Sequence, residues 1–220
     1  MNIQAVFFDF DYTLADTGDI VVRGFADACP LLGLPAPDAQ AVRRTVGGTL
    51  EEIYIASVGP LPDQDTFARF REAYHDSIDP VSCEMTHFFP ETRAALSKMK
   101  DMGLTLCIVT NKQARFAREP LEKAGLLKYF DRIVGRGEMP APKPDPRGIL
   151  RLAGELSLSP RQIVFCGDSL FDARAAQNAD LSFAAVLTGQ TTREEFLPYR
   201  PFAICDNLEK LAETLENAAL

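Results

Sequence analysis

Two aspartates, Asp9 and Asp11, directly follow an apolar run near the beginning of the 220-residue chain. Residues two apart in an extended segment face the same side at roughly 6.5–7 Å, so both carboxylates can face one small ligand. Carboxylates this close repel each other unless a cation or a shared proton lies between them. Two solvated acids at the end of a strand would show the same spacing, so the pair by itself does not establish a site.

Polar side chains also follow an apolar run in the middle of the chain and occupy a proline-rich loop. Thr110 and Asn111 come directly after the run 106–109, although Thr110 could simply cap the next helix. Lys143 is flanked by two prolines, which restrict the backbone and present its ammonium group from a stiff loop. An exposed loop lysine would also fit that sequence. Each of these segments therefore allows a site but does not require one.

A second pair of acids follows a later apolar run. Asp168 stands at the end of that run, and Asp172 comes four residues later. In a helix this spacing is about one turn, so both carboxylates can face the same site. The alternative is that Asp168 caps a helix and Asp172 stabilises the helix dipole. Coincidence explains each segment alone, but it does not explain all four in this order.

The segments that must position these side chains are short apolar or β-branched runs, which predict buried parallel strands. They span 3–8, 104–109, 132–134 and 162–166, with a fifth at 183–187 and a weaker one at 202–204. Helical patterns lie between them, so we predict an α/β fold with a doubly wound, mostly parallel sheet. Ligands of such sheets bind outside the carboxyl ends of the strands, where the polar segments lie.

The stretch 16–82 contains no convincing strand. Apolar side chains recur there at helical spacing in two groups, which are Val21, Phe25, Ala28 and Leu32, and Phe67, Phe70, Tyr74 and Ile78. We therefore predict an all-helical cap domain over 16–82, inserted into a core domain made of 1–15 and 83–220.

Composition limits the partners of the chain. The excess of 31 Asp+Glu over 23 Lys+Arg argues against nucleic-acid or anionic-membrane partners, because like charges repel. No apolar run approaches the roughly 18 residues of a membrane span, and no export signal is recognisable, so we expect a cytoplasmic protein. The five scattered cysteines suit reduced thiols. His75 and His87 have no partner at metal-ligand spacing.

Taken together, the four segments resemble the signature of the haloacid dehalogenase-like (HAD) hydrolase superfamily. The signature consists of DxDxT, a threonine at the end of a strand, a lysine in K-P-x-P and G-D-S-x-x-D, and the chain contains all four in order. Within that superfamily the sequence is similar to the phosphoglycolate phosphatase-like branch, which has a helical cap after the first motif. The resemblance covers nearly the whole chain and implies a Rossmann-like core.

The resemblance implies a role for each motif residue. Asp9 would be the nucleophile that forms an aspartyl-phosphate, and Asp11 the general acid that protonates the leaving alcohol and later activates water. Thr110 and the backbone N–H of Asn111 would bind phosphoryl oxygens, while Lys143 would offset the negative charge of Asp9 and the phosphoryl group. Phosphoryl transfer depends mostly on positioning and charge stabilisation, which is consistent with these roles.

The resemblance also implies a magnesium site. Mg²⁺ would be held by the side chain of Asp9, the carbonyl of Asp11 and Asp168, with Asp172 as an outer ligand or an orienting group. A carboxylate that attacks a phosphate dianion meets like-charge repulsion, so a bridging cation is needed, and Mg²⁺ prefers carboxylate and phosphate oxygens. These four aspartates therefore form the predicted metal site.

Two positions depart from the family pattern, because Tyr12 and Asp180 stand where glycine is usual. We expect Tyr12 to make the turn after the nucleophile bulkier. Asp180 tolerates a left-handed backbone better than most residues do. Arg43 and Arg44 precede two glycines where related caps project a loop toward the active site, so one arginine is a candidate for binding a substrate carboxylate or second phosphate. Two solvated helix arginines are an equally good interpretation.

The leading hypothesis is a Mg²⁺-dependent phosphatase that acts on a small phosphorylated metabolite, with phosphoglycolate as the first candidate. A phosphomutase acting on a sugar phosphate would use the same intermediate but would exclude water. A non-catalytic protein that binds a phosphorylated metabolite is the third possibility. We expect no nucleic-acid or membrane partner, and either a monomer or a homodimer.

Overall fold

The main sheet of the computed structural model, which describes residues 2–219, has six parallel strands in the order β5-β4-β1-β6-β7-β8. The strands are β1 (Ala5–Phe8), β4 (Thr105–Val109), β5 (Arg132–Val134), β6 (Ile163–Gly167), β7 (Ser182–Val186) and β8 (Ala203–Cys205). All six predicted runs are strands, with ends that differ by at most two residues. The predicted fold class, α/β with a doubly wound parallel sheet, is confirmed.

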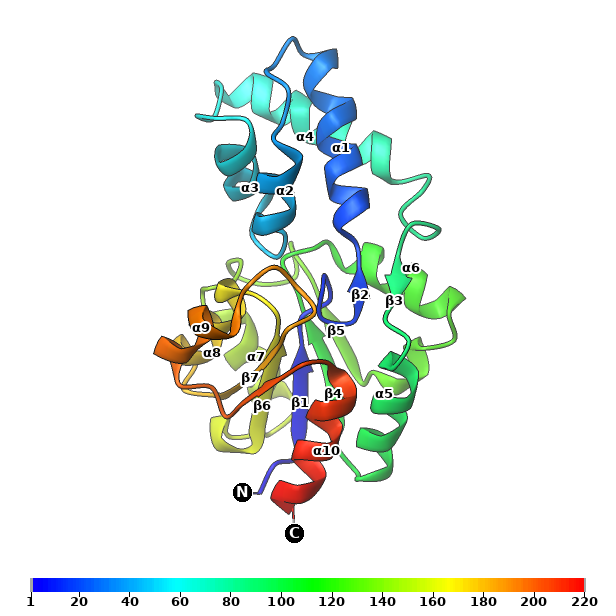
Figure 1. The fold of residues 1–220 in the computed structure, drawn as a ribbon, viewed down its shortest axis with the longest axis vertical. Coiled ribbons are helices and arrows are strands. Elements are labelled where there is room, and N and C mark those ends of the chain that lie inside the picture. The colour runs from blue at the N-terminus through cyan, green and yellow to red at the C-terminus, as the bar shows by residue number, and fades with distance from the viewer. Residues whose placement is uncertain (1, 220) are drawn as a thin grey trace.

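Helices cover both faces of this sheet (Figure 1). In β1, Val6 and Phe8 pack toward one layer, whereas Ala5 and Phe7 pack toward the other, and all four are buried. The first layer contains α5 (Thr92–Asp101), α6 (Ala114–Lys123) and α10 (Leu208–Ala219), and the second contains α7 (Arg147–Glu155), α8 (Leu170–Asn178) and α9 (Arg193–Phe196). Burial on both faces explains the continuous apolar runs of the strands. Within residues 2–219 no helix combines the length and the apolar character that crossing a membrane would require.

Four further helices form a separate layer above the carboxyl ends of the strands, and we call them the cap (Figure 1). They are α1 (Gly18–Leu31), α2 (Ala39–Thr45), α3 (Leu50–Ser57) and α4 (Gln64–Ile78). The two apolar groups singled out in the sequence lie largely on α1 and α4. Helices α2 and α3 are shorter and begin at capping side chains: Asp38 accepts from the backbone at the start of α2, and Thr49 forms a capping box with Glu52 at the start of α3.

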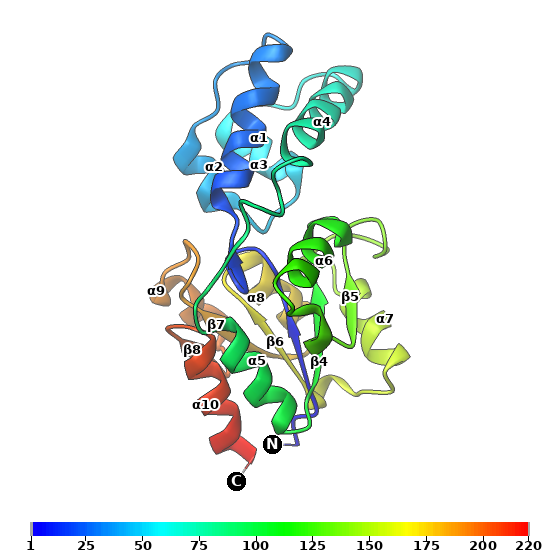
Figure 2. The same ribbon diagram turned by 90° about the vertical axis from the view of Figure 1, so that its right-hand side faces the viewer.

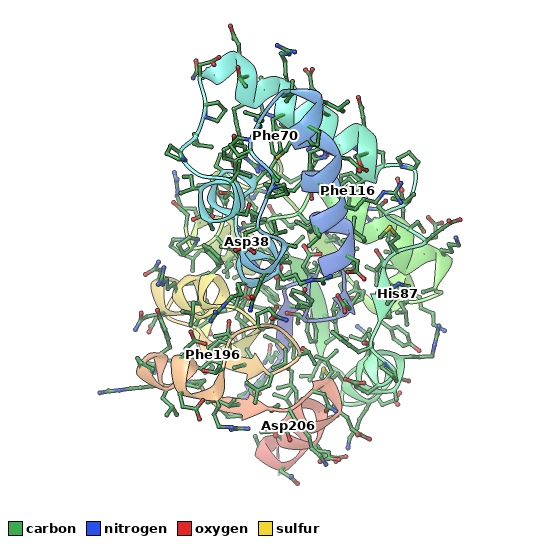
Figure 3. All side chains as sticks on the ribbon, turned by 45° about the horizontal axis from the view of Figure 1, so that its top comes forward. Asp38, Phe70, His87, Phe116, Phe196 and Asp206 are labelled. Carbon is green, nitrogen blue, oxygen red and sulfur yellow. The ribbon has the colours of Figure 1, made fainter. Side chains whose placement is uncertain are left out.

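Aromatic rings fill the interior of the cap. The ring of Phe70 lies 5.1 Å from that of Phe25 and 5.0 Å from that of Tyr54, both at steep angles. Figure 3 shows Phe70 among the cap helices and Phe116, from α6 of the core, at the base of the cap. Edge-to-face packing of this kind stabilises the cap beyond the burial of area alone.

The chain passes between core and cap through two short segments that lie side by side (Figure 2). They are β2 (Ala15–Asp16) and β3 (His87–Phe88), which pair antiparallel as a two-stranded sheet. The hydroxyl of Thr92, the first residue of α5, donates to the carbonyl of Leu14 at 2.9 Å. Both crossings are therefore attached to each other and to the core.

Candidate active site

The four sequence motifs meet at the carboxyl ends of the three central strands. Asp9 follows β1, Thr110 follows β4 and Asp168 follows β6, and β1 lies between the other two strands. The backbone N–H of Asp9 donates to the carbonyl of Cys166 at 2.9 Å, which fixes the end of β1 against β6. All three side chains are buried. Their convergence follows from the strand order, because parallel strands end at one edge of the sheet.

Lys143 joins two of the predicted carboxylates. Its Nζ lies 2.8 Å from Oδ1 of Asp9 and 2.6 Å from Oδ1 of Asp172, and the lysine is only 1% exposed. Burial alone would lower the pKa of Lys143, but the charges of Asp172 and Asp9 raise it above its ordinary value. Lys143 is therefore a fixed positive charge within the site.

Asn111 holds the loop that carries Lys143. Its Oδ1 accepts the backbone N–H of Lys143 at 2.7 Å, and its Nδ2 donates to the carbonyl of the same residue at 3.1 Å. The same Nδ2 donates to the carbonyl of Gly47 in the cap at 3.0 Å. Asn111 thus connects the end of β4, the lysine loop and the cap.

Asp172 uses both of its oxygens on donors from the protein. Oδ1 meets Lys143, and Oδ2 accepts from the hydroxyl and the backbone N–H of Ser169 at 2.6 and 3.1 Å. These contacts fit an orienting group for Lys143 better than a direct metal ligand. Asp168 accepts from the hydroxyl of Thr13 at 2.9 Å, and burial together with the charges of Asp172 and Asp9 raises its pKa well above the usual range.

The carboxylate of Asp9 is fully buried, and neither of its oxygens accepts a hydrogen bond from residues 2–219. Its contact with Lys143 is an ion pair. Burial is the main cause that raises the pKa of Asp9 to about 7, with Lys143 opposing and the nearby Asp172 and Asp11 adding to the shift. Oxygens of Asp9, Asp168 and Asp172 lie within 4.8 Å of one another. A buried carboxylate without hydrogen bonds beside a second acid is a donor set that fits Mg²⁺.

Asp11 lies close to Asp9 in the sequence but has different partners. Its Oδ1 lies 2.6 Å from Nζ of Lys112 and accepts the hydroxyl of Thr17. The contact with Lys112 was missed by the sequence analysis. Its only signal is position, because Lys112 directly follows the Thr110 and Asn111 motif.

A cavity of about 90 Å³ lies beside Asp11, between core and cap. Gly47 forms part of its wall, and a Cβ at that position would lie 3.2 Å from Oγ of Ser169 and 3.9 Å from Oδ2 of Asp9. Gly47 also has φ of +98°, which side chains rarely tolerate. Glycine therefore lets the cap approach the proposed nucleophile closely.

The two cap arginines singled out in the sequence do not line this cavity. Arg43 pairs with Asp19 of the cap, and Arg44 lines a separate depression together with Ser169 and Arg174. Arg71 and Arg136 line the cavity instead. Arg71 lies four residues after Phe67 and three before Tyr74, so it borders the apolar stripe of α4, and that spacing was the available signal.

Tyr12 and Asp180, which replace the usual glycines, both adopt left-handed backbone conformations, with φ of 54° and 56°. Tyr12 is buried against the cap, and its hydroxyl lies within hydrogen-bonding reach of Arg43. The bulkier turn expected at Tyr12 therefore extends into the cap, so one residue of the core motif packs inside the cap cluster.

The chain matches a known protein family over most of its length. The model of the haloacid dehalogenase-like hydrolase family matches residues 6–186. The chain belongs to this family. It is 27% identical to a phosphoglycolate phosphatase of Vibrio parahaemolyticus, covering 99% of this chain and 98% of that protein, and 32% identical to one of Nitrosospira multiformis over 81% of each chain. A solved structure from Bacteroides fragilis, described as a haloacid dehalogenase-like hydrolase, is 32% identical with a TM-score of 0.90, covering 95% of this chain and 99% of that one.

Proposed function

We propose that this haloacid dehalogenase-like phosphatase hydrolyses a small phosphate monoester in two steps, with Asp9 as the nucleophile and Mg²⁺ as the cofactor. The observation that carries the proposal is the buried carboxylate of Asp9, which accepts no hydrogen bond from residues 2–219 and forms an ion pair with Lys143 beneath the cap. Phosphoglycolate is the first ester to test, because relatives that match nearly the whole chain carry the name phosphoglycolate phosphatase.

In the first step, an oxygen of Asp9 forms a bond to phosphorus while the ester P–O bond breaks. The electron pair of that bond stays with the leaving oxygen, which takes a proton from Asp11. Thr110 and the backbone N–H of Asn111 bind the transferring phosphoryl oxygens, and Lys143 stabilises the negative charge that they share with Asp9. The product is an aspartyl-phosphate and a free alcohol.

In the second step, Asp11 accepts a proton from a water molecule whose oxygen attacks phosphorus. The bond between phosphorus and Asp9 breaks, its electron pair returns to the carboxylate, and inorganic phosphate leaves. Lys112, 2.6 Å from Oδ1 of Asp11, orients that carboxylate toward the cavity. The same aspartate therefore acts first as an acid and then as a base.

The carboxylates of Asp9 and Asp168 and the carbonyl of Asp11 would hold Mg²⁺, and the ion would offset the repulsion between Asp9 and the phosphate dianion. Asp172 would hold Lys143 in place rather than bind the ion, because its oxygens already accept from Lys143 and Ser169. This division assigns two of the four predicted carboxylates as side-chain ligands.

The test is phosphate release from a panel of phosphate monoesters, with Mg²⁺ and with EDTA. We expect release that EDTA abolishes and that Asp9→Asn reduces by about 10³-fold or more, with the fold retained. The exposed Asp206 provides a matched control, since Asp206→Asn should leave turnover unchanged. Substantial hydrolysis by Asp9→Asn would contradict the nucleophile assignment. An isomerised product without phosphate release would identify a mutase, and no release from any ester would favour a binding protein.

A further inference from the structure

The wall of the cavity beside Asp11 is largely apolar. Val21, Ile53 and Ile78 of the cap and Phe116 of the core are among its lining residues, and each is buried. The residues assigned to the phosphoryl group, Asp9 among them, do not line it, apart from Asn111. The cavity is therefore the space for the alcohol half of the ester. A glycolate group has one methylene and would leave most of this apolar wall without a partner.

The cavity has room for more than one group of the size of a water molecule. Its volume is about 90 Å³, and a site for a single water molecule requires at least about 10–15 Å³.

The charges on the cavity wall are mostly positive. Lys112, Arg136 and Arg71 line it, and Asp11 is its only acid among the lining residues within 2–219. Lys112 pairs with Asp11, and Arg136 meets both oxygens of Glu51 at 3.0 Å. Arg71 pairs with no side chain in the described part of the chain, so it is the cation that remains available to a ligand.

Arg71 lies where the cavity meets the outer surface. Together with His75 and Gln113 it lines both this cavity and an open groove on the outer surface, so these three residues separate the two spaces. Asp11 and Asn111 line only the inner space. A molecule whose phosphate lies at Asp9 therefore passes the apolar wall before it reaches Arg71.

We propose that the cavity selects phosphate monoesters whose alcohol half has an apolar middle and an anionic far end that pairs with Arg71. The inference rests on the proposed phosphatase function and narrows its substrate class. It excludes phosphoglycolate as the preferred ester, because that molecule has the anion without the apolar middle.

The test uses four primary-alcohol esters: 2-phosphoglycolate, hexyl phosphate, 6-phosphooxyhexanoate and 6-aminohexyl phosphate. We expect kcat/KM for 6-phosphooxyhexanoate to exceed that for 2-phosphoglycolate by about 10-fold or more, because four further methylenes are buried. Hexyl phosphate should fall between them, and the aminohexyl ester should be the poorest of the three six-carbon esters.

Arg71→Gln should reduce kcat/KM for the hexanoate ester by about fivefold and leave hexyl phosphate unchanged. Arg69→Gln, on the same helix but outside the cavity wall, should change neither.

Binding to the Asp9→Asn variant, measured by isothermal titration calorimetry, separates the inference from the proposed function. Preferred turnover of 2-phosphoglycolate would overturn the inference but would be consistent with the proposed phosphatase function. An equal effect of Arg71→Gln on the hexanoate and hexyl esters would contradict the proposed pairing between Arg71 and an anionic group of the substrate. Preferred binding of the hexanoate ester without turnover of any ester by the unmodified protein would support the inference and overturn the proposed function. The absence of both binding and turnover would overturn both the inference and the proposed function.

Discussion

Beneath the cap the chain buries charge, whereas inside the cap it buries aromatic rings. At the sheet edge, Asp9, Lys143 and Asp172 are almost fully inaccessible and depend on one another. In the cap, Phe25 and Phe70 are equally buried but pack within an apolar cluster. The two regions meet at Gly47 and Asn111.

A single substitution has a different energetic cost in the two regions. Removing one partner from a buried ion pair leaves an uncompensated charge, and this costs more than the pair itself contributes. Removing part of an apolar side chain leaves a cavity, and neighbouring groups relax into it in part. The core edge should therefore tolerate almost no change, whereas the cap can vary in shape and thereby in the alcohol that it accepts.

The largest loss of stability should come from Lys143→Met, which removes the cation shared by Asp9 and Asp172 at the core edge. Asp9 and Asp172 would then face each other without compensation, and we expect the free energy of unfolding to fall by about 3–5 kcal/mol. Turnover should fall by about 10²–10³-fold as charge stabilisation is lost. Chemical denaturation and phosphate release measure the two effects. Lys128→Met, at a lysine outside the site, is the control, and an equal loss of stability there would contradict the account.

Gly47→Ala tests the contact between the two regions. Its positive φ should make alanine cost about 1–2 kcal/mol of stability, and the added Cβ near Ser169 and Asp9 should reduce turnover by about 10–100-fold. Gly33 provides the control, since it also has a positive φ but no atom lies within 4 Å of the position that a Cβ would take there. Gly33→Ala should show a comparable loss of stability with unchanged turnover. If both variants lose activity equally, the close approach at Gly47 is not the cause.

The charged region should also respond to pH and metal together. Without metal, the pKa of Asp9 is about 7 in the folded protein, whereas its ordinary value is 3.8. Between these two pH values the folded protein therefore binds more protons than the unfolded chain does. The contribution of Asp9 to stability is therefore complete below about pH 4 and is lost as the pH rises through about 7. Binding of Mg²⁺ by Asp9, as proposed above, would displace that proton.

We therefore expect the increase in Tm on adding Mg²⁺ to be small at about pH 5 and to reach a few degrees at about pH 8. Differential scanning calorimetry at constant ionic strength measures it. Asp9→Asn should reduce the pH dependence of this increase, and the part that remains should come from Asp168, whose pKa burial also raises. An equal gain in Tm at both pH values would contradict the assignment of Asp9 to the metal site.

The smallest effect should come from Tyr12→Phe, on the cap side of the comparison. The ring stays buried and only the contact of the hydroxyl with Arg43 is lost, so we expect a decrease of about 0.5–1.5 kcal/mol in the free energy of unfolding. Turnover should change by less than about threefold. Arg43→Gln should give a similar loss, and the double variant should lose less than the sum of the two. Additive losses would show that the two side chains do not interact.

Much of the fold could be predicted because the four central strands of the sheet are almost entirely buried and so appear as continuous apolar runs. The convergence of Asp9, Thr110 and Asp168 could also be predicted, since polar residues at the ends of parallel strands share one edge. These predictions needed only local patterns and a general rule of topology. The roles of these residues remain predictions that the experiments above address.

The cap side of the site could not be predicted in the same way. Whether Arg43 or Arg71 reaches the cavity depends on how α2 and α4 pack against α1 and the core, which no short pattern in the sequence specifies. Likewise, Lys112 contacts Asp11 from a distant part of the sequence. The left-handed conformation of Tyr12, directly after Asp11, is also unusual for tyrosine. Tertiary packing decides both cases.

The paired strands β2 and β3 determine how the cap can move. Two separate linkers would allow the cap to twist as well as tilt, but Ala15 pairs with Phe88 and Asp16 with His87, so both linkers must turn together. We therefore expect a rigid-body motion of the cap to be mainly a rotation about this paired segment. Thr17 follows β2 directly and donates to Asp11, so any rotation about that axis also displaces a hydrogen-bond donor of the acid beside the cavity. A change in the orientation of the cap therefore also changes the hydrogen bonding of Asp11.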